Sequence, residues 1–233
     1  MDFSRFNTVS FDCYGTLINW EAGILPTIER ILDHHGNQLP APEILKFYGE
    51  FEAKAEAGEY QKYRKVLESV VAQFGERLGF QPSAAEMRSL ADSVPSWPAF
   101  SDTVAALREL KKNYRLAIIS NIDDDLFAQT RRLLGVEFDS VTTAEQAGSY
   151  KPSLNNFQLA MRSAGVGADK LLHVGQSIYH DVLPAQSLGI ATVWVNRASA
   201  RPGVGAVIGA EGKPDLEVRD LASLAESLGA VAR

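Results

Sequence analysis

Four short segments of the chain carry side chains whose types and order suit covalent chemistry. The first runs from Phe11 to Leu17, where Asp12 follows a short apolar run and Gly15 permits a tight turn. A carboxylate at the end of a buried strand is a nucleophile, a metal ligand or part of a turn, and Asp close to Gly is common in turns. This segment alone leaves all three interpretations open.

Three later segments supply partners that such a carboxylate would need. They contain Ser120 and Asn121, then Lys151, and finally the sequence Gly-Gln-Ser-Ile-Tyr-His-Asp, which includes Ser177 and ends in Asp181. Each has a common structural explanation when taken alone: a strand end, a solvated lysine or a helix N-cap. Their joint occurrence in this order favours one shared site.

The pattern of apolar residues predicts how these segments meet. Residues 6–11 are predicted as a first strand, and helices alternate with strands from about residue 102 onward. The later strands are predicted at residues 116–119, 140–143, 171–174 and 191–195. This alternation is typical of a doubly wound, Rossmann-like parallel sheet with helices on both faces. Because loops after parallel strands emerge at one edge, the four segments are expected to meet there.

A purely helical block separates the first strand from the alternating part. Apolar residues recur at helical spacing from about residue 20 to residue 95, with no strand pattern between them. We predict a small helical cap domain over residues 19–96, inserted into an α/β core domain formed by residues 1–18 and 97–233. The Pro-rich stretch 94–98 is the expected return hinge.

Composition limits the class of protein. The chain has 233 residues, of which 45% are hydrophobic, so it can bury a large core. A net charge of −6 argues against nucleic acid or an anionic membrane as a partner. Cys13 is the single cysteine, which excludes an intrachain disulfide, and we expect it to be a buried apolar filler. Without a membrane-spanning stretch or a signal core, a cytoplasmic location is expected.

Two other patterns carry less chemistry. The Gly-rich stretch 201–212 lacks the dinucleotide-binding spacing and is predicted to be a surface loop. His34, His35 and His173 lack metal-ligand spacing to other ligands, so no zinc site is expected. His180 lies beside Asp181, but no Gly-x-Ser-x-Gly nucleophile elbow accompanies it.

The combination and order of the four segments resemble the haloacid dehalogenase superfamily of hydrolases, over nearly the whole chain. Within it the chain is most similar to the type II 2-haloacid dehalogenases, which have Tyr two residues after the nucleophilic Asp, as Tyr14 stands here. The resemblance implies that Asp12 attacks a halogen-bearing carbon and forms an aspartyl ester. Water then releases a 2-hydroxy acid. It also implies a small carboxylate substrate and a homodimer.

The resemblance assigns catalytic roles to the partners of Asp12. Lys151 would keep Asp12 ionised, and Thr16 would orient its oxygens by a hydrogen bond. Asp181 would orient Lys151 and activate the hydrolytic water.

It also assigns four residues to the substrate. Tyr14 would lie against it, and Ser120 would help to orient the carboxylate of the nucleophile. Asn121 would help to hold the halide, and Ser177 with nearby backbone amides would bind the substrate carboxylate.

Two positions favour carbon–halogen chemistry over phosphate-ester chemistry. Phosphatases of the superfamily have a second Asp, which protonates the leaving alkoxide, where Tyr14 stands, and usually a magnesium-binding carboxylate where Gln176 stands. Losing a general acid costs an ester leaving group about 10²–10⁴-fold in rate. A halide leaves as a stable anion and needs no proton. We therefore expect a hydrolytic dehalogenase of short 2-haloalkanoic acids that requires no cofactor and no metal.

Three departures from the type II pattern keep alternatives open. No Arg lies between Pro40 and Tyr63, where type II enzymes place the one that cradles the halide, and Phe157 stands where they tend to have Tyr. The fourth motif, with Gln176, has the length and final Asp of the phosphatase form.

One alternative is a magnesium-dependent phosphatase acting on a small phosphate ester. The ion would lie among Asp12, the carbonyl of Tyr14 and Asp181. A second alternative is a catalytically idle member that serves as a binding subunit.

Overall fold

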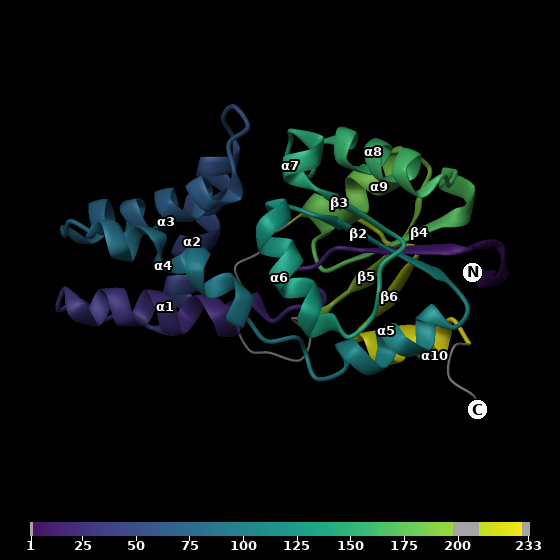
Figure 1. Cartoon of the computed structure of the whole chain (residues 1–233), viewed down its shortest axis with the longest axis horizontal. Helices are drawn as coiled ribbons and strands as arrows, with labels where there is room; N and C mark the ends of the chain where they lie inside the picture. Colours follow the sequence, from purple (N-terminus) through teal and green to yellow (C-terminus); the bar gives the residue numbers. More distant parts are fainter. Residues whose placement is uncertain (1, 198–209, 230–233) are drawn as a thin grey trace.

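The computed structural model describes residues 2–197 and 210–229 and shows a parallel sheet with helices on both faces (Figure 1). The strand order is β3-β2-β1-β4-β5-β6, and every neighbouring pair is parallel. The strands are β1 (Thr8–Phe11), β2 (Arg115–Ser120), β3 (Ser140–Thr143), β4 (Leu171–Gly175), β5 (Ala191–Val195) and β6 (Leu216–Val218). The order reverses at β1, and ligands of open α/β sheets bind at the carboxyl ends of strands around such a point.

Helices bury both faces of the sheet. In Figure 1, α5 (Thr103–Lys111) and α10 (Leu221–Ser227) cover one face, and α8 (Leu154–Ala164) and α9 (Leu183–Ser187) cover the other. The side chains of Val9 and Phe11 in β1 are fully buried, as expected for a strand with a helix on either side. The short α7 (Ala144–Ala147) follows β3, and α6 (Asp124–Leu134) follows β2.

The cap consists of four helices that lie to one side of the sheet in Figure 1. They are α1 (Trp20–His34), α2 (Ala41–Glu56), α3 (Tyr63–Leu78) and α4 (Ala84–Ser93), all between β1 and α5 in the chain. Their buried faces carry the apolar residues of the helical pattern, and Ser83 and Glu86 form a capping box at the start of α4. The α/β core with an inserted helical cap is confirmed, while the domain boundaries stay a prediction.

Trp97 packs where the cap returns to the core, directly after a 3₁₀ turn at Val94–Ser96. Its ring is almost fully buried and meets the ring of Tyr14 edge-on at 5.8 Å between centroids. A Cβ on Gly23 of α1 would lie 2.1 Å from this indole, so only glycine allows the approach. The tryptophan thus ties the first helix of the cap to the loop that carries the nucleophile candidate.

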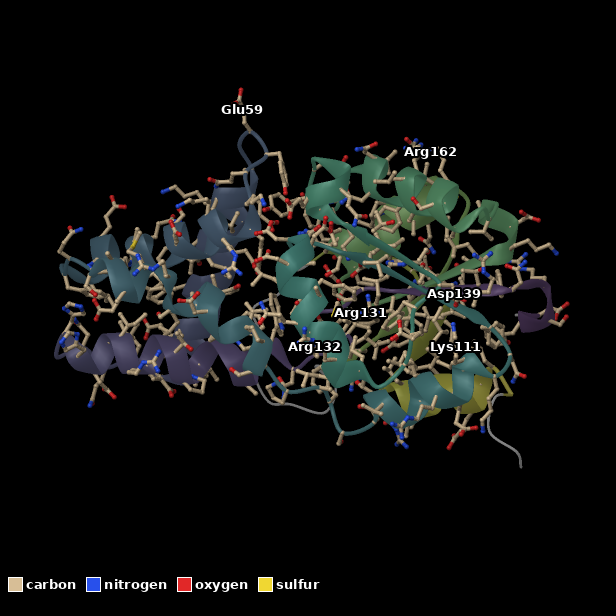
Figure 2. All side chains as sticks on the ribbon, in the orientation of Figure 1. Glu59, Lys111, Arg131, Arg132, Asp139 and Arg162 are labelled. Carbon is tan, nitrogen blue, oxygen red and sulfur yellow. The ribbon has the colours of Figure 1, made fainter. Side chains whose placement is uncertain are left out.

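Charged side chains lie on the outside of the core, where Figure 2 labels several of them. Lys111 and Asp139 form one surface ion pair, and Arg131 and Glu137 form another. Exposed pairs of this kind contribute roughly 0–1 kcal/mol each to stability. Stability therefore depends on the apolar interior, which includes Cys13, fully buried as predicted.

The structure differs from the predicted elements in three ways. β6 and α10 were not predicted, because a three-residue strand is shorter than the 4–8 residues that give a recognisable pattern. The first strand is shorter than residues 6–11. A π-helical turn at Ile178–Val182, between β4 and α9, was also not predicted.

Two further predictions concern the Gly-rich stretch and membrane-spanning segments. The Gly-rich stretch 201–212 falls mostly outside the described residues. Within the described part of the chain, none of the helices has the length and apolar character to cross a bilayer.

Candidate active site

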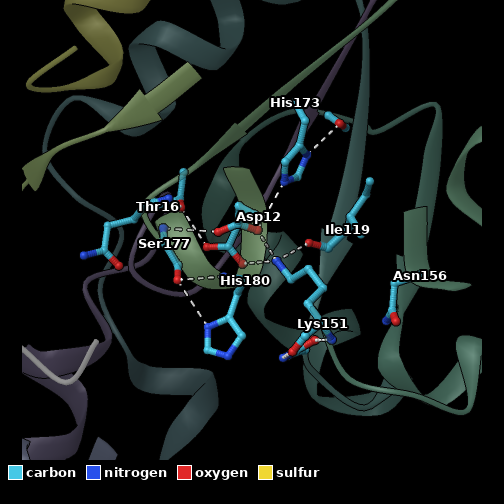
Figure 3. Close-up of polar contacts among 12 residues, drawn as sticks. Asp12, Thr16, Ile119, Lys151, Asn156, His173, Ser177 and His180 are labelled. Atoms are coloured by element: carbon cyan, nitrogen blue, oxygen red, sulfur yellow. Dashed lines mark hydrogen bonds and ion pairs between the residues drawn. The ribbon is translucent and has the colours of Figure 1, made fainter. Parts of the chain in front are cut away.

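The sheet brings the four predicted segments to one edge (Figure 3). Asp12 directly follows β1, Asn121 directly follows β2, and Asp181 lies in the turn after β4. Lys151 lies in the loop between α7 and α8 and reaches back under this edge. The predicted juxtaposition is therefore present, while the catalytic and binding roles stay predictions.

Lys151 is the electrostatic centre of the site. Its side chain is 2% exposed, and Nζ donates to Asp12 Oδ1 (2.8 Å), Asp181 Oδ1 (2.7 Å) and the carbonyl of Ile119 (3.0 Å). Burial alone would lower the pKa of Lys151, but the two carboxylates outweigh burial and raise it above its ordinary value. The ammonium is therefore fixed in charge and has no free proton to offer a substrate.

Asp12 is held from both sides in an orientation suited to attack. Its Oδ2 accepts a hydrogen bond from Thr16 Oγ1 at 2.7 Å, and Thr16 Oγ1 in turn accepts one from the backbone N–H of Gln176 at 2.9 Å. Burial raises the pKa of Asp12, whereas Lys151 opposes that rise. Lys151 and Thr16 are thus placed where they can orient the carboxylate and favour its ionised form, and these roles stay predictions.

Asp181 is saturated by donors. Oδ1 accepts from Lys151 and from His173 Nε2 (3.1 Å), and Oδ2 accepts from the backbone N–H of Ser177 (3.2 Å). His173 Nδ1 faces the Ser10 hydroxyl at 2.9 Å, so a tautomer with the proton on Nε2 satisfies both contacts. Burial is outweighed by Lys151 and His173, which hold the pKa of Asp181 well below its ordinary value. Asp181 is therefore well placed to orient Lys151. That Asp181 activates the hydrolytic water stays a prediction.

The predicted substrate-binding residues differ in whether their polar side-chain atoms already have hydrogen-bond partners within the protein. Asn121 clamps the loop of Lys151, since Oδ1 accepts from the Lys151 N–H (2.7 Å) and Nδ2 donates to its carbonyl (3.2 Å). Ser120 Oγ is buried and has no hydrogen-bond partner among the described residues. Ser177 Oγ accepts from the backbone N–H of His180 at 3.0 Å, so Ser177, rather than Asp181, is the N-cap.

Tyr14 presents its ring rather than its hydroxyl to the site. Its oxygen lies 2.8 Å from Thr130 Oγ1 in α6, and burial raises the pKa of Tyr14 well above its ordinary value. The position that would hold a general acid in a phosphatase therefore holds an apolar surface.

A cavity of about 60 Å³ lies in front of Asp12, between the sheet edge and the cap. The core contributes Asp12, Tyr14, Ser120, Asn121, Lys151, Gln176, Ser177, His180 and Asp181. The cap contributes Trp20, Gly49, Glu52, Ala53, Glu56 and Tyr63. Among the described lining residues Lys151 is the sole Lys or Arg. Lys62 and Arg64, two of the cap cations, instead pair with Glu145 and Asp125 on the core.

The cap forms an acidic wall that no sequence motif indicated. Glu52 and Glu56 stand one turn apart on α2, one and two turns after Tyr48. This four-residue spacing on a helix that faces Asp12 was the available signal. His180 also lines the cavity, and burial lowers its pKa to about 4, so its imidazole is neutral at pH 7.

The donor set near Asp12 does not fit a magnesium ion. Magnesium takes oxygen ligands in near-octahedral geometry, mostly from carboxylates and water. Here Gln176 stands at one carboxylate position, and both oxygens of Asp181 already accept hydrogen bonds.

One cluster of potential ligands lies elsewhere, on the cap. His34, His35 and Glu86 bring three ligand atoms within 4.8 Å of one another, which the sequence spacing did not indicate. Glu86 Oε1 contacts both imidazoles, at 2.7 and 3.2 Å, and Oε2 accepts from the Ser83 N–H. The cluster is thus satisfied by its own hydrogen bonds.

Gly175 is predicted to be irreplaceable for the position of Asp181. A Cβ at Gly175 would lie 2.4 Å from Asp181 Cγ, so Gly175→Ala must displace the carboxylate from Lys151. We expect a loss of about 1–3 kcal/mol in the free energy of unfolding in urea. Gly58→Ala is the control, because a Cβ there meets nothing within 4 Å. Equal stability of Gly175→Ala and the unmodified protein would contradict the prediction.

The chain is similar to several known proteins in sequence and in fold. The chain is 26% identical over 223 residues to an (S)-2-haloacid dehalogenase of Pseudomonas putida, covering 94% of this chain and 96% of that protein. It is 27% identical to a pyrophosphatase, PpaX, of Bacillus pumilus strain SAFR-032, over 84% and 85% of the two chains. The fold matches L-2-haloacid dehalogenase from Xanthobacter autotrophicus with chloropropionic acid covalently bound (TM-score 0.81, 18% identity, 97% and 100% covered).

A match to a protein-family model shows to which family the chain belongs. Residues 6–189 match the model of haloacid dehalogenase-like hydrolases, which spans all four site segments. The chain therefore belongs to the haloacid dehalogenase-like hydrolase family.

Proposed function

We propose that this hydrolase is a metal-independent dehalogenase of short 2-haloalkanoic acids. The observation that carries the proposal is the setting of Asp12: Lys151 and Thr16 hold it, and neither an acid at position 14 nor a free carboxylate in the fourth motif accompanies it. Such a nucleophile suits a leaving group that departs as a stable anion. The small cavity in front of Asp12 suits a short substrate.

The proposed reaction has two steps. An oxygen of Asp12 forms a bond to C2 of the substrate while the carbon–halogen bond breaks, and its electron pair leaves with the halide. Water then adds to Cγ of the Asp12 ester, and the bond from Cγ to the substrate oxygen breaks. One water proton goes to that oxygen, giving the 2-hydroxy acid, and the other is released to solvent.

The residues around Asp12 support each step. In the first step Lys151 and Thr16 hold the carboxylate in one orientation, so that its attack needs no rearrangement. In the second step Lys151, still held by Asp181, stabilises the charge that develops on the ester oxygen. Ser120 Oγ, which has no partner among the described residues, is available to the substrate.

The relatives support the proposal unevenly. The similar Pseudomonas putida protein is described as an (S)-2-haloacid dehalogenase, which favours carbon–halogen chemistry. The similar Bacillus pumilus protein is a pyrophosphatase, in line with the phosphatase alternative. That alternative has less support from the site, because Asp181 is engaged by Lys151, His173 and the Ser177 N–H.

Halide release in the presence of EDTA tests the proposal. We expect halide and 2-hydroxy acid in equal amounts from (S)-2-chloropropionate or from a haloacetate, at a rate that EDTA leaves unchanged. A panel of small phosphate esters, with and without Mg²⁺, is the control. Phosphate release that requires Mg²⁺, without halide release from any 2-haloacid, would contradict the proposal and favour the phosphatase.

A further inference from the structure

The cap presents acids where a departing anion would emerge. In a backside displacement the leaving group departs on the side opposite to the nucleophile. Asp12 projects from the sheet edge, so the halide would depart toward the cap wall formed by Glu52, Glu56 and Tyr63. No described cap residue that lines the cavity carries a positive charge. A site of this kind would repel a halide unless its carboxyl groups are neutral.

We propose that Glu52, as a neutral carboxylic acid, donates a hydrogen bond from Oε2 to the departing halide. This inference rests on the proposed dehalogenase function and names the residue that replaces a cationic halide cradle. The proton stays on Glu52 throughout, and the electron pair of the carbon–halogen bond leaves with the halide.

Hydrogen bonds within the cap decide which oxygen of Glu52 carries the proton. Oε1 accepts from the hydroxyls of Tyr63 (2.5 Å) and Tyr48 (3.0 Å), and these two hydroxyls lie 3.0 Å apart. Oε2 has no hydrogen-bond partner among the described residues. An oxygen that already accepts two donors is the poorer place for a proton, so the proton belongs on Oε2. The two tyrosines thus fix the rotamer of the acid and leave its donor free for a ligand.

The surroundings favour the neutral form near neutral pH. Burial raises the pKa of Glu52 to about 7, against the two tyrosine hydroxyls, which favour the anion. Burial and the proximity of Glu52 raise the pKa of Glu56 well above its ordinary value.

The other groups around the cavity also favour the neutral form of Glu52. Among the described residues that line the cavity, α3 contributes Tyr63 and α1 contributes the uncharged Trp20. Across the cavity lie neutral His180 and the triad of Lys151, Asp12 and Asp181, whose net charge of −1 disfavours a further anion. A buried carboxylic acid kept neutral in this way can act as a hydrogen-bond donor at neutral pH.

The pH dependence of halide release gives the first test. Because the neutral form is required, turnover should fall about tenfold per pH unit above the pKa of Glu52, about 7. Glu52→Gln keeps a donor on the same side chain, so this alkaline decline should disappear. Glu52→Ala should lower turnover on the order of 10–100-fold below that pH, and Glu52→Gln should recover most of that loss.

Two matched variants separate a donor from a merely structural residue. Tyr48→Phe removes a hydrogen bond that stabilises the anion of Glu52, so the alkaline decline should move to higher pH. Glu56→Gln should keep the decline. If Glu52→Gln retains the alkaline decline, or if Glu52→Ala turns over as fast as the unmodified protein, the proposal is overturned.

Bromide binding, measured by calorimetry without substrate, separates this inference from the dehalogenase proposal. The unmodified protein should bind bromide more weakly one pH unit above about 7 than one unit below it, and Glu52→Gln should bind equally at both. This pattern without turnover would leave the role of Glu52 intact and refute the dehalogenase. Bromide binding that is absent or independent of both pH and Glu52 would refute the role of Glu52, whether or not halide is released.

Discussion

Asp12→Asn is expected to abolish halide release, with a loss of at least about 10³-fold in turnover, because an amide oxygen is a far weaker nucleophile than a carboxylate. The amide is nearly isosteric, and Asn still accepts a hydrogen bond from Thr16 or Lys151, so the fold should persist. Turnover is measured by halide release under single-turnover conditions, and the fold by circular dichroism.

Thr16→Val is the matched control for this variant. It removes one hydrogen bond to the carboxylate of Asp12 and keeps the nucleophile. A hydrogen bond to a charged group is worth roughly 1.5–3 kcal/mol, so the expected loss is about 10–150-fold. If Asp12→Asn loses no more activity than Thr16→Val, Asp12 is not the nucleophile.

Lys151→Met should have the largest effect on stability and should also lower turnover. The variant leaves the carboxylates of Asp12 and Asp181 buried and facing each other without the ammonium that both contact. Removing one partner of a buried ion pair costs about 3–5 kcal/mol in the free energy of unfolding. The pKa of Asp12 should rise, so less of the nucleophile is ionised at neutral pH. Urea denaturation measures the first effect and halide release the second.

The pH dependence of this loss has a defined sign. In the unmodified protein the pKa of Asp181 is depressed by Lys151 and His173. The resulting stabilisation is fully present above the unfolded pKa of about 3.9 and is lost as the pH falls through the lower folded value. In Lys151→Met, protonation of either carboxylate relieves the repulsion, so the stability deficit should shrink toward acid pH. A deficit that is constant from neutral to acid pH would contradict the ion-pair account.

The arrangement of the core was predictable because its strands are buried on both faces. Residues 116–119 are continuously apolar, residues 171–174 are apolar apart from His173, and alternation with helices permits few topologies. β6 was missed because three residues, of which Glu217 is exposed, give no periodic signal. The turn at Ile178–Val182 was missed because no periodic pattern distinguishes a π-helical turn from the start of an α-helix.

The candidate site was predictable on the core side and not on the cap side. Asp12 and Asp181 follow strands, and Lys151 follows the short helix α7 after β3, so parallel topology brings their loops together without knowledge of side-chain packing. The orientation of the cap over the sheet depends instead on contacts such as that between Trp97 and Gly23, which no local pattern encodes. Glu52 and Glu56 therefore had the appearance of surface residues on an amphipathic helix.

The same limitation affected the hydroxyls and amides of the site. Asn121 has the residue type of a ligand, but both ends of its amide are used on the backbone of Lys151. Tyr14 likewise directs its hydroxyl to Thr130, more than a hundred residues away in the chain. Residue type and order thus indicated the class of chemistry, and only the packed structure shows which donors remain available.

Isotope transfer from water to Asp12 tests the central claim most directly. A single turnover in ¹⁸O-labelled water, with protein in excess of (S)-2-chloropropionate, should place ¹⁸O in the carboxylate of Asp12, because water attacks Cγ of the aspartyl ester. Mass analysis of the peptide that contains Asp12 should show the heavy isotope there, and the 2-hydroxy acid should be unlabelled. Label in the 2-hydroxy acid, with none in that peptide, would mean that water attacks the substrate directly and would contradict covalent catalysis by Asp12.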